Sequence, residues 1–232
     1  MQEKADALPN PPAKLSEQAL DQIRARIVDG TLALGEAISE TSLAQVLNVS
    51  KTPVREALQE LKREGLVQII PKRGTFVFEA SPELVRELSD FRLVLETAAL
   101  ERAMANAWGR LVDHLEPVVA EMAAAIGAAD LPRYRRLDAA LHRGIVAHCG
   151  NAFLQEAHAA IEFRIQALRT RLSSAAENNA RTMGEHQALV AAIAARDADG
   201  AGEVLRHHIL QTRESYLAQM REGHGAHLSA AS

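Results

Sequence analysis

Three histidines and one aspartate occupy helical faces that are otherwise apolar. Asp138 and His142 are four residues apart and share one side of a helix, and His186 and His208 each run with leucine and isoleucine at helical spacing. Three imidazoles and one carboxylate suit a divalent transition metal, zinc first, or nickel, manganese or iron. Burying these groups unpaired would cost free energy, which a shared metal would offset. The alternative is that each histidine is a core residue satisfied by hydrogen bonds.

A second group of candidate residues lies near residue 50, at a predicted helix start that carries basic side chains. Thr52 followed by Pro53 predicts a helix that begins there with Thr52 as the cap, or with Ser50 as the cap instead. Lys51, Thr52 and Arg55 would then lie on or beside an exposed first turn. Arginine can contact guanine with two hydrogen bonds, and lysine or threonine can reach a phosphate or a base. The alternative is a solvated helix start that has no partner.

The segments around this helix fit a winged helix-turn-helix. Helices are predicted over 16–29 and from Ser39, with a loop or short strand between them, and residues 66–70 and 75–78 predict two strands. The turn between those strands carries Lys72, Arg73 and Gly74, which could reach a phosphate or the minor groove, or could simply be a hydrophilic turn. We therefore expect a DNA-binding domain over 15–78.

The composition limits the class of protein and its compartment. The net charge of −4 argues against indiscriminate binding to nucleic acid, but residues 50–73 hold six basic and three acidic side chains. The single cysteine excludes an intrachain disulfide and fits a cytoplasmic location. No apolar run approaches the roughly 20 residues that cross a bilayer. Residues 1–14 contain three prolines and predict a disordered lead-in.

The rest of the chain predicts helices only. After a linker at 79–81, helical stretches are expected over 82–106, 109–127, 131–149, 152–174, 180–196 and 200–221. The fold class is therefore mainly α: a winged helix-turn-helix followed by an all-α antiparallel bundle of six or seven helices over 82–222, with a flexible tail at 223–232. Outside the cluster, solvated positions are expected for six histidines: His114, His148, His158, His207, His224 and His227.

The run LAQVLNVSKTPVREALQELKREGLVQIIPKRGTFV resembles the winged helix-turn-helix of the GntR family of bacterial transcription regulators. The resemblance implies that Lys51, Thr52 and Arg55 contact an operator. Assisting residues would be Arg24, Ser50 and the turn from Lys72 through Arg73 to Gly74. Lys51 stands where the family usually has arginine, and Leu34 where proline often precedes glycine. Lysine keeps the charge but loses the fork of donors, which puts the base preference in doubt rather than DNA binding.

The segments DAALHRGIVAHCGN, GEHQALVAAIAARDADGA and VLRHHI are similar to the FCD ligand-binding domain of the FadR-type branch. That resemblance implies an all-helical bundle that holds a metal through Asp138, His142, His186 and His208. FRLVLE resembles a family segment whose arginine meets an effector carboxylate, which assigns that role to Arg92. Arg164 is a weaker candidate for the effector pocket. The alternative for Arg92 is a salt bridge to Glu96 one turn away.

These expectations together describe a homodimeric regulator. A groove-reading helix needs two copies to read a palindromic operator, and a small organic acid would bridge the metal and Arg92. Repression released by the ligand is the expected mode. Two alternatives remain: a DNA-binding module on a purely structural dimerisation bundle, and a helical metalloenzyme. The second lacks the His-Asp dipeptide of helical phosphohydrolases, a glycine-rich phosphate loop and a nucleophile elbow.

Overall fold

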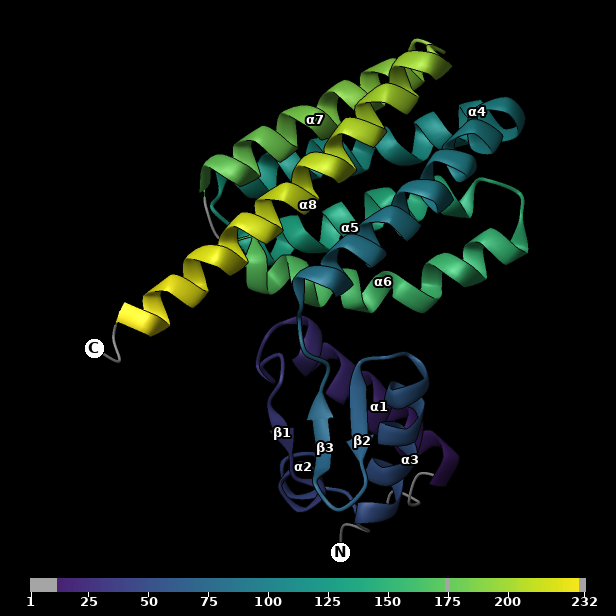
Figure 1. Ribbon diagram of the computed structural model, residues 1–232. Coiled ribbons are helices and arrows are strands. Elements are labelled where there is room, and N and C mark those ends of the chain that lie inside the picture. Colours follow the sequence, from purple (N-terminus) through teal and green to yellow (C-terminus); the bar gives the residue numbers. More distant parts are fainter. Residues whose placement is uncertain (1–11, 174–175, 230–232) are drawn as a thin grey trace, which may run out of the picture. The chain divides into compact units, whose positions relative to one another are not determined.

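The computed structural model describes residues 12–173 and 176–229, and side chains over 15–173 and 179–222. The chain divides into two compact units, Met1–Glu79 and Ala80–Ser232 (Figure 1). Most of the expected lead-in, residues 1–11, lies outside the described residues, as do the last three residues of the expected tail.

The first unit combines three helices with a small antiparallel sheet. Its elements are α1 (Pro12–Val28), β1 (Ala37–Ile38), α2 (Glu40–Val46), α3 (Lys51–Arg63), β2 (Val67–Ile70) and β3 (Gly74–Val77). The strand order is β1-β3-β2, so the short strand β1 pairs with β3 on the side opposite β2. Buried side chains from the helices and from the start of the hairpin form its core: Ile23, Ile27, Leu58, Leu61 and Leu66. The unit therefore has the winged helix-turn-helix order.

Local signals explain where α2 and α3 begin. Ser39 caps α2 by accepting a hydrogen bond from the backbone N–H of Ser42 at 3.2 Å, and Asn48 turns the chain with a φ of 52°. Ser50 occupies the N-cap position of α3, so the prediction of a cap at Thr52 is wrong; the alternative is right in position, although the Ser50 side chain makes no capping hydrogen bond. Pro53 fits the first turn because backbone N–H groups there have no partner within the helix.

The hairpin turn has left-handed backbone at two positions. Lys72 has a φ of 63° and Gly74 a φ of 116°, and Gly74 pairs with Ile70 at the last step of the β2–β3 register. A glycine adopts such a φ without the steric cost that a side chain would add. The backbone thereby holds Lys72 and Arg73 at the tip of the wing.

The second unit contains only helices among its described residues. They are α4 (Pro82–Gly127), α5 (Leu131–Ala147), α6 (Ala152–Leu172), α7 (Ala176–Ala194) and α8 (Ala198–Ser229). α4 has non-helical backbone at Ala107 (φ −142°, ψ 22°), so it consists of two segments that meet next to the predicted break at Gly109. α8 continues as helix to Ser229, where the sequence predicts a tail from residue 223. No described helix has both the length and the apolar character of a membrane span.

The bundle core lies among α4, α5, α7 and α8, and large buried side chains fill it: Leu100, Leu111, Leu115, Leu141, Ile145, Leu189, Leu205 and Ile209. Gly144 lets α5 approach α4 closely, because a Cβ there would lie 2.6 Å from the ring of His114. Trp108 donates a hydrogen bond to the Ile193 carbonyl oxygen at 2.7 Å, and the Arg196 guanidinium lies 3.9 Å from the Trp108 ring. These contacts fasten the bend of α4 to the end of α7.

Candidate functional site

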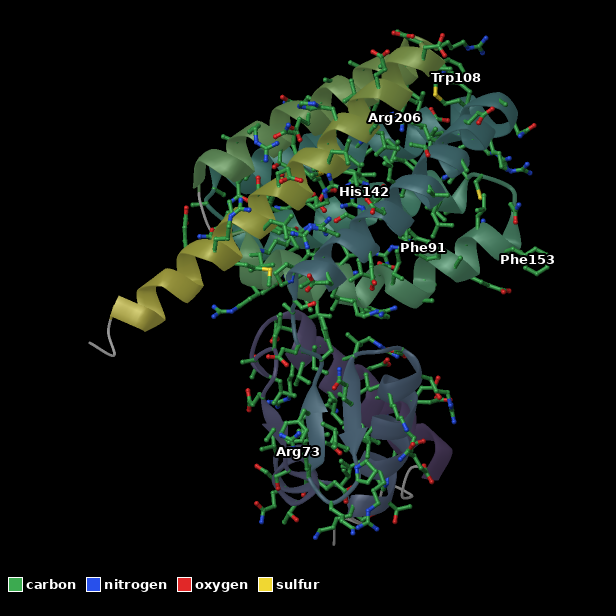
Figure 2. All side chains as sticks on the ribbon, in the orientation of Figure 1. Arg73, Phe91, Trp108, His142, Phe153 and Arg206 are labelled. Atoms are coloured by element: carbon green, nitrogen blue, oxygen red, sulfur yellow. The ribbon has the colours of Figure 1, made fainter. Side chains whose placement is uncertain are left out.

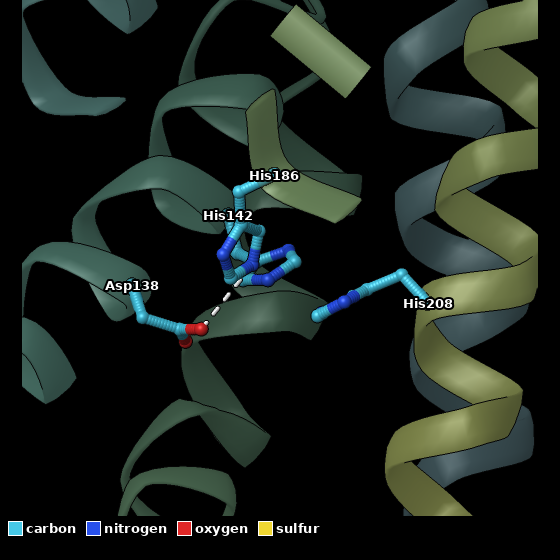
Figure 3. Close-up of side chains that lie close together, drawn as sticks. All are labelled: Asp138, His142, His186 and His208. Atoms are coloured by element: carbon cyan, nitrogen blue, oxygen red, sulfur yellow. Dashed lines mark ion pairs between the residues drawn. The ribbon is translucent and has the colours of Figure 1, made fainter. Parts of the chain in front are cut away.

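Four predicted ligands meet inside the bundle. Asp138 and His142 come from α5, His186 from α7 and His208 from α8, and one ligand atom of each lies within 4.8 Å of the others. Figure 2 shows His142 in the bundle interior, and Figure 3 shows the three rings turned toward the Asp138 carboxylate. Each of the four residues is at most 3% exposed. Three helices thus bring together a carboxylate and three imidazoles away from solvent.

A buried carboxylate orients the His142 ring. The Oε2 atom of Glu96 lies 2.7 Å from His142 Nδ1, and Glu96 Oε1 accepts a hydrogen bond from Arg92 Nε at 2.5 Å. Because an ionised carboxylate only accepts, Nδ1 must be the donor, and a neutral His142 then carries its lone pair on Nε2. A carboxylate behind the ring nitrogen is the usual support of a metal-binding histidine.

His208 has the same kind of support from α7. The Oε2 atom of Glu185 lies 2.9 Å from His208 Nδ1, while Arg181 donates a hydrogen bond to Glu185 Oε1 at 2.5 Å and another to the Ser215 hydroxyl at 3.1 Å. This chain of contacts again leaves Nε2 of the imidazole as the lone-pair atom that faces the cluster.

The other two members interact mainly with the cluster itself. Asp138 forms an ion pair with the Arg169 guanidinium of α6, and its Oδ1 atom lies 3.3 Å from His186 Nε2. The three imidazole rings lie close together, with centroid separations of 4.6 to 5.6 Å. Asp138 thus contacts both the histidine cluster and the buried guanidinium of Arg169.

Burial and neighbouring charges keep the histidines neutral and the acids ionised. Burial lowers the pKa of His186 to about 3, and it lowers the pKa values of His142 and His208 as well. Burial alone would raise the pKa of Asp138, but Arg169 and His186 hold it below its usual range. The same opposition, with Arg92 and His142 as the neighbours, holds the pKa of Glu96 well below its usual range. Neutral imidazole and ionised carboxylate are the forms that bind metal.

The unpaired ring nitrogens test whether a metal fits. The Nε2 atoms of His142, His186 and His208 are buried, and none has a hydrogen-bond partner among the described residues. Buried polar nitrogen without a partner is costly, and here three such atoms converge on one carboxylate. The alternative of separately hydrogen-bonded core histidines leaves these three atoms unexplained. The donor set suits zinc, nickel, manganese or iron.

The predicted effector arginines differ in position. Arg92 forms the salt bridge to Glu96 that the sequence offered as the bland alternative, yet its Nη2 atom is buried and has no hydrogen-bond partner within the described chain. Arg92 and Arg169 line a small cavity beside His142, whereas Arg164 is absent from that lining and hydrogen-bonds to the Ala160 carbonyl oxygen at 3.3 Å. The geometry at the cluster favours Arg169 over Arg164.

The prediction of a solvated position for His158 is wrong. Its side chain is 4% exposed, and its Nε2 atom lies 3.7 Å from Glu96 Oε1, because α6 covers this side of the cluster. His207 is 62% exposed, as expected. His114 and His148 contact each other, with ring centroids 5.2 Å apart, and the side chains of His224 and His227 lie outside the described part.

The sequence interpretation left out Glu185 and Arg169, although signals for both exist. Glu185 directly precedes a predicted ligand, and Arg169 lies on α6 among Ile161, Ile165, Leu168 and Leu172. A charged residue in an apolar stripe predicts a buried partner of opposite sign. The identity of that partner depends on which helices pack together.

The predicted DNA-reading residues lie at the exposed start of α3. Lys51, Thr52 and Arg55 are all exposed, while Val54 and Leu58 of the same helix are buried. The Nε atom of Arg55 donates to Glu40 Oε2 at 2.7 Å, and the Arg55 side chain is 63% exposed. An exposed ion pair is weak, so Arg55 can exchange Glu40 for a phosphate or a base at little cost.

The assisting residues fall into two groups. Lys72 and Arg73 are exposed at the wing tip, and the Arg73 guanidinium lies 6.0 Å from the Phe76 ring. Arg24 instead forms two hydrogen bonds to Glu64, at 2.9 and 2.5 Å, and its side chain is 14% exposed. These bonds join α1 to the end of α3, so the geometry of Arg24 favours a structural role.

Two family models match this chain, one on each side of the boundary between the units. The model "Bacterial regulatory proteins, gntR family" matches residues 15–77, and the model "FCD domain" matches residues 87–211. The first covers the helix-turn-helix and its wing. The second covers the helices that supply all four cluster residues.

Relatives and a solved structure agree with both models. The chain is 31% identical over 228 residues to the HTH-type transcriptional regulator BphR of Paraburkholderia xenovorans, covering 94% of this chain and 91% of that one. It is 28% identical over 181 residues to the gluconate operon transcriptional repressor of Bacillus subtilis, covering 76% and 74%. The structure of E. coli McbR/YncC has the same fold, with a TM-score of 0.78 at 22% identity over 89% of this chain and 98% of that one.

Proposed function

This chain belongs to the GntR family of bacterial regulatory proteins and carries an FCD domain, and from that premise we propose a repressor whose operator binding is controlled by a small organic acid at a metal-containing bundle. The chain is a DNA-binding transcriptional regulator and not an enzyme. The observation that carries the finer proposal is the convergence of three unpaired buried Nε2 atoms on Asp138.

Asp138, His142, His186 and His208 would hold the metal. When bound, such an ion supplies a Lewis-acidic centre that attracts a carboxylate. Glu96 and Glu185 fix the His142 and His208 rings so that Nε2 is the binding atom of each. Burial excludes water from the cluster and strengthens the electrostatic attraction for an anion.

The organic acid would meet Arg92. Its Nη2 atom is buried without a hydrogen-bond partner among the described residues, and its side chain lines two small cavities, one of which is also lined by His142. A guanidinium group binds a carboxylate through charge-assisted hydrogen bonds. One of the relatives carries a name that refers to the operon of a sugar acid, gluconate, which is consistent with a carboxylate effector.

The operator would meet the start of α3 and the wing. Lys51, Thr52 and Arg55 would read bases and phosphates, with Ser50 and the turn from Lys72 to Gly74 contacting the backbone of the duplex. A homodimer would present two such surfaces to the half-sites of a palindrome. Because linkage is reciprocal, an acid that releases DNA must bind less tightly to the operator complex than to the free protein.

A comparison of two histidine variants tests this proposal. His186→Ala removes one presumed ligand, whereas His207→Ala removes an exposed imidazole next to His208. Metal content by elemental analysis should fall sharply in the first variant and stay at the wild-type level in the second. Fluorescence anisotropy on a duplex from the chain's own promoter should show that His186→Ala no longer responds to acids that release the wild type. Equal metal content in both variants would contradict the proposed metal site. Equal responses of their DNA binding to the acids would favour a purely structural bundle.

A further inference from the structure

A second group of unpaired polar atoms lies on another side of the cluster. The Tyr134 hydroxyl, the Asn179 Nδ2 atom and the Thr212 hydroxyl are buried, and each lacks a hydrogen-bond partner among the residues that the structure describes. They come from α5, α7 and α8, and all three line one cavity together with Asp138 and His208. None of them belongs to the candidate metal ligands, so a metal would leave these atoms unsatisfied.

The Thr212 hydroxyl departs from the behaviour of other hydroxyls in this bundle. Hydroxyls within helices commonly donate to the carbonyl oxygen four residues earlier. Thr97 does so to Leu93 at 2.6 Å, and Ser215 to Gln211 at 3.0 Å. The hydroxyl of Thr212 makes no such bond, although its helix provides the carbonyl oxygen of His208 at the same spacing. Its hydroxyl is therefore available to a bound molecule.

Three small cavities surround the cluster and share walls. Arg92 lines the first two, Thr212 and Tyr216 line the second and third, and Arg169 lines the first and third. Their volumes of about 10, 20 and 20 Å³ correspond to water-sized spaces. Arg92 lines the second cavity and Asn179 the third, and Tyr216 is a wall of both, so a bound molecule that displaces the Tyr216 side chain would join these two cavities into one chamber between Arg92 and Asn179.

The two ends of this chamber differ in charge. Arg92 offers an unpaired cationic N–H, whereas the other end offers an amide and two hydroxyls. Arg169 near that end is already paired with Asp138. Burial raises the pKa of Tyr134, so its phenol keeps its proton and can donate as well as accept. A second carboxylate at this end would be repelled by the Asp138 anion and would find no unpaired guanidinium. Neutral hydroxyl groups could instead form hydrogen bonds with all three polar side chains.

We propose that the effector is a polyhydroxylated monocarboxylic acid, whose carboxylate lies toward Arg92 and whose hydroxyl groups bind Tyr134, Asn179 and Thr212. This inference rests on the proposed function, because it names the chemical class of the same effector. The subsite selects against unsubstituted aliphatic acids, since these would leave the three buried polar groups without partners.

A calorimetric panel on the full-length, zinc-loaded protein tests the ligand class. The hydroxylated probes are L-threonate, D-xylonate, D-gluconate and D-galactonate, and the matched probes are butyrate, pentanoate, hexanoate and the dicarboxylate adipate. At least one hydroxylated acid should bind about 100-fold or more tightly than the unsubstituted acid of equal length. Hexanoate or adipate binding as tightly as the best sugar acid would overturn the proposal, and so would failure of all four sugar acids to bind at millimolar concentration.

Two variants, one at Thr212 and one at Tyr134, test the residues of the subsite. Thr212→Val should weaken binding of the best hydroxylated acid by about three- to tenfold, and Tyr134→Phe should do the same. Thr97→Val is the matched control, because its hydroxyl already donates to the Leu93 carbonyl oxygen, and it should leave the affinity unchanged. Melting temperatures check that each variant folds. If both Thr212→Val and Tyr134→Phe bind like the wild type, the unpaired atoms hold ordered water only and the subsite is refuted.

Binding and DNA release are measured separately, so the two proposals can fail separately. A sugar acid that binds through Thr212 but leaves operator affinity unchanged would refute the proposed function and support the subsite. An unsubstituted acid that binds as tightly and releases the operator would refute the subsite and support the proposed function.

Discussion

Arg55 in the first unit and Arg169 in the second both pair with a carboxylate, but the Arg55 side chain is 63% exposed and the Arg169 side chain 7%. The exposed pair with Glu40 contributes little to stability and can be exchanged for a nucleic acid partner. The buried pair with Asp138 cannot be broken without leaving a charge in the interior. Similar residue types therefore serve an exchangeable surface in one unit and a fixed, preorganised interior in the other.

The two units also differ in their histidine content. All nine histidines lie beyond residue 80, and five of the seven whose side chains the structure describes are partly or fully buried. In the proposed function the first unit would read DNA with permanently charged lysine and arginine, whereas the bundle would bind its metal with neutral imidazoles. Proton and metal concentrations should therefore act on the second unit and leave the first largely unaffected.

The largest expected effect is acid destabilisation of the bundle in chelator-treated protein. The pKa of His186 is lowered from 6.5 to about 3, so the unfolded chain takes up a proton at a higher pH than the folded bundle does. The stabilisation is complete above about pH 6.5 and is lost as the pH falls toward 3, at about 1.4 kcal/mol per pH unit for His186 alone. The lowered pKa values of His142 and His208 act in the same direction.

Denaturant titrations between about pH 7.5 and pH 5 check this prediction. The bundle transition should shift to lower denaturant concentration, while the transition of the histidine-free first unit should hardly move. Equal shifts of both transitions would remove the contrast between the units.

Loss of the Glu96 charge should have the next largest effect. Glu96→Gln keeps the side-chain volume but removes the negative charge, and so weakens the ion pair with Arg92 and the hydrogen bond with His142, which are both buried. We expect a loss of about 3–5 kcal/mol in the free energy of unfolding and about 10- to 100-fold in metal affinity. Glu83→Gln breaks an exposed pair with Arg86 on the same helix and should change stability by less than about 0.5 kcal/mol. Similar losses in the two variants would contradict a special role for Glu96.

Replacement of Arg55 should change recognition and not folding. Arg55→Ala should lower the preference for the operator over scrambled duplex by about 1–3 kcal/mol, measured by anisotropy. Arg63→Ala, at the opposite end of α3 and paired with Glu60, serves as the control and should keep that preference. Unchanged melting of both units in Arg55→Ala would agree with the weakness of its pair with Glu40, and a fall in bundle stability would contradict it.

The smallest expected effect concerns the bend in α4. Trp108→Phe removes the hydrogen bond to the Ile193 carbonyl oxygen and weakens stacking with Arg196, so we expect a loss of about 1–2 kcal/mol in bundle stability with metal content unchanged. Chemical denaturation and elemental analysis measure the two quantities. A loss of metal would mean that the bend positions the cluster through α7, the helix that also carries His186.

Local patterns were sufficient for most of the fold and for the four cluster residues. The breaks at Gly109 and Gly150 were predicted because turn residues interrupt apolar periodicity there, and the bend at Ala107 and the left-handed φ of Gly150 lie at those places. His186 and His208 stood out because they are polar on apolar stripes. The residues that support them could not be assigned, since Glu96 lies 46 residues from His142 and contacts it only through helix packing. The same reason explains why the burial of His158 was missed.

The position of Arg92 and Glu96 on α4 has a mechanical consequence. Both residues lie in the uninterrupted segment between the Ser81 cap and the bend at Ala107, and Pro82, the first helical residue, follows closely on the boundary at Glu79. At a rise of 1.5 Å per residue, the ten steps from Pro82 to Arg92 span about 15 Å of continuous helix. A molecule that binds Arg92 and tilts or twists this segment would therefore move the start of α4, close to the boundary between the units. No loop would have to rearrange.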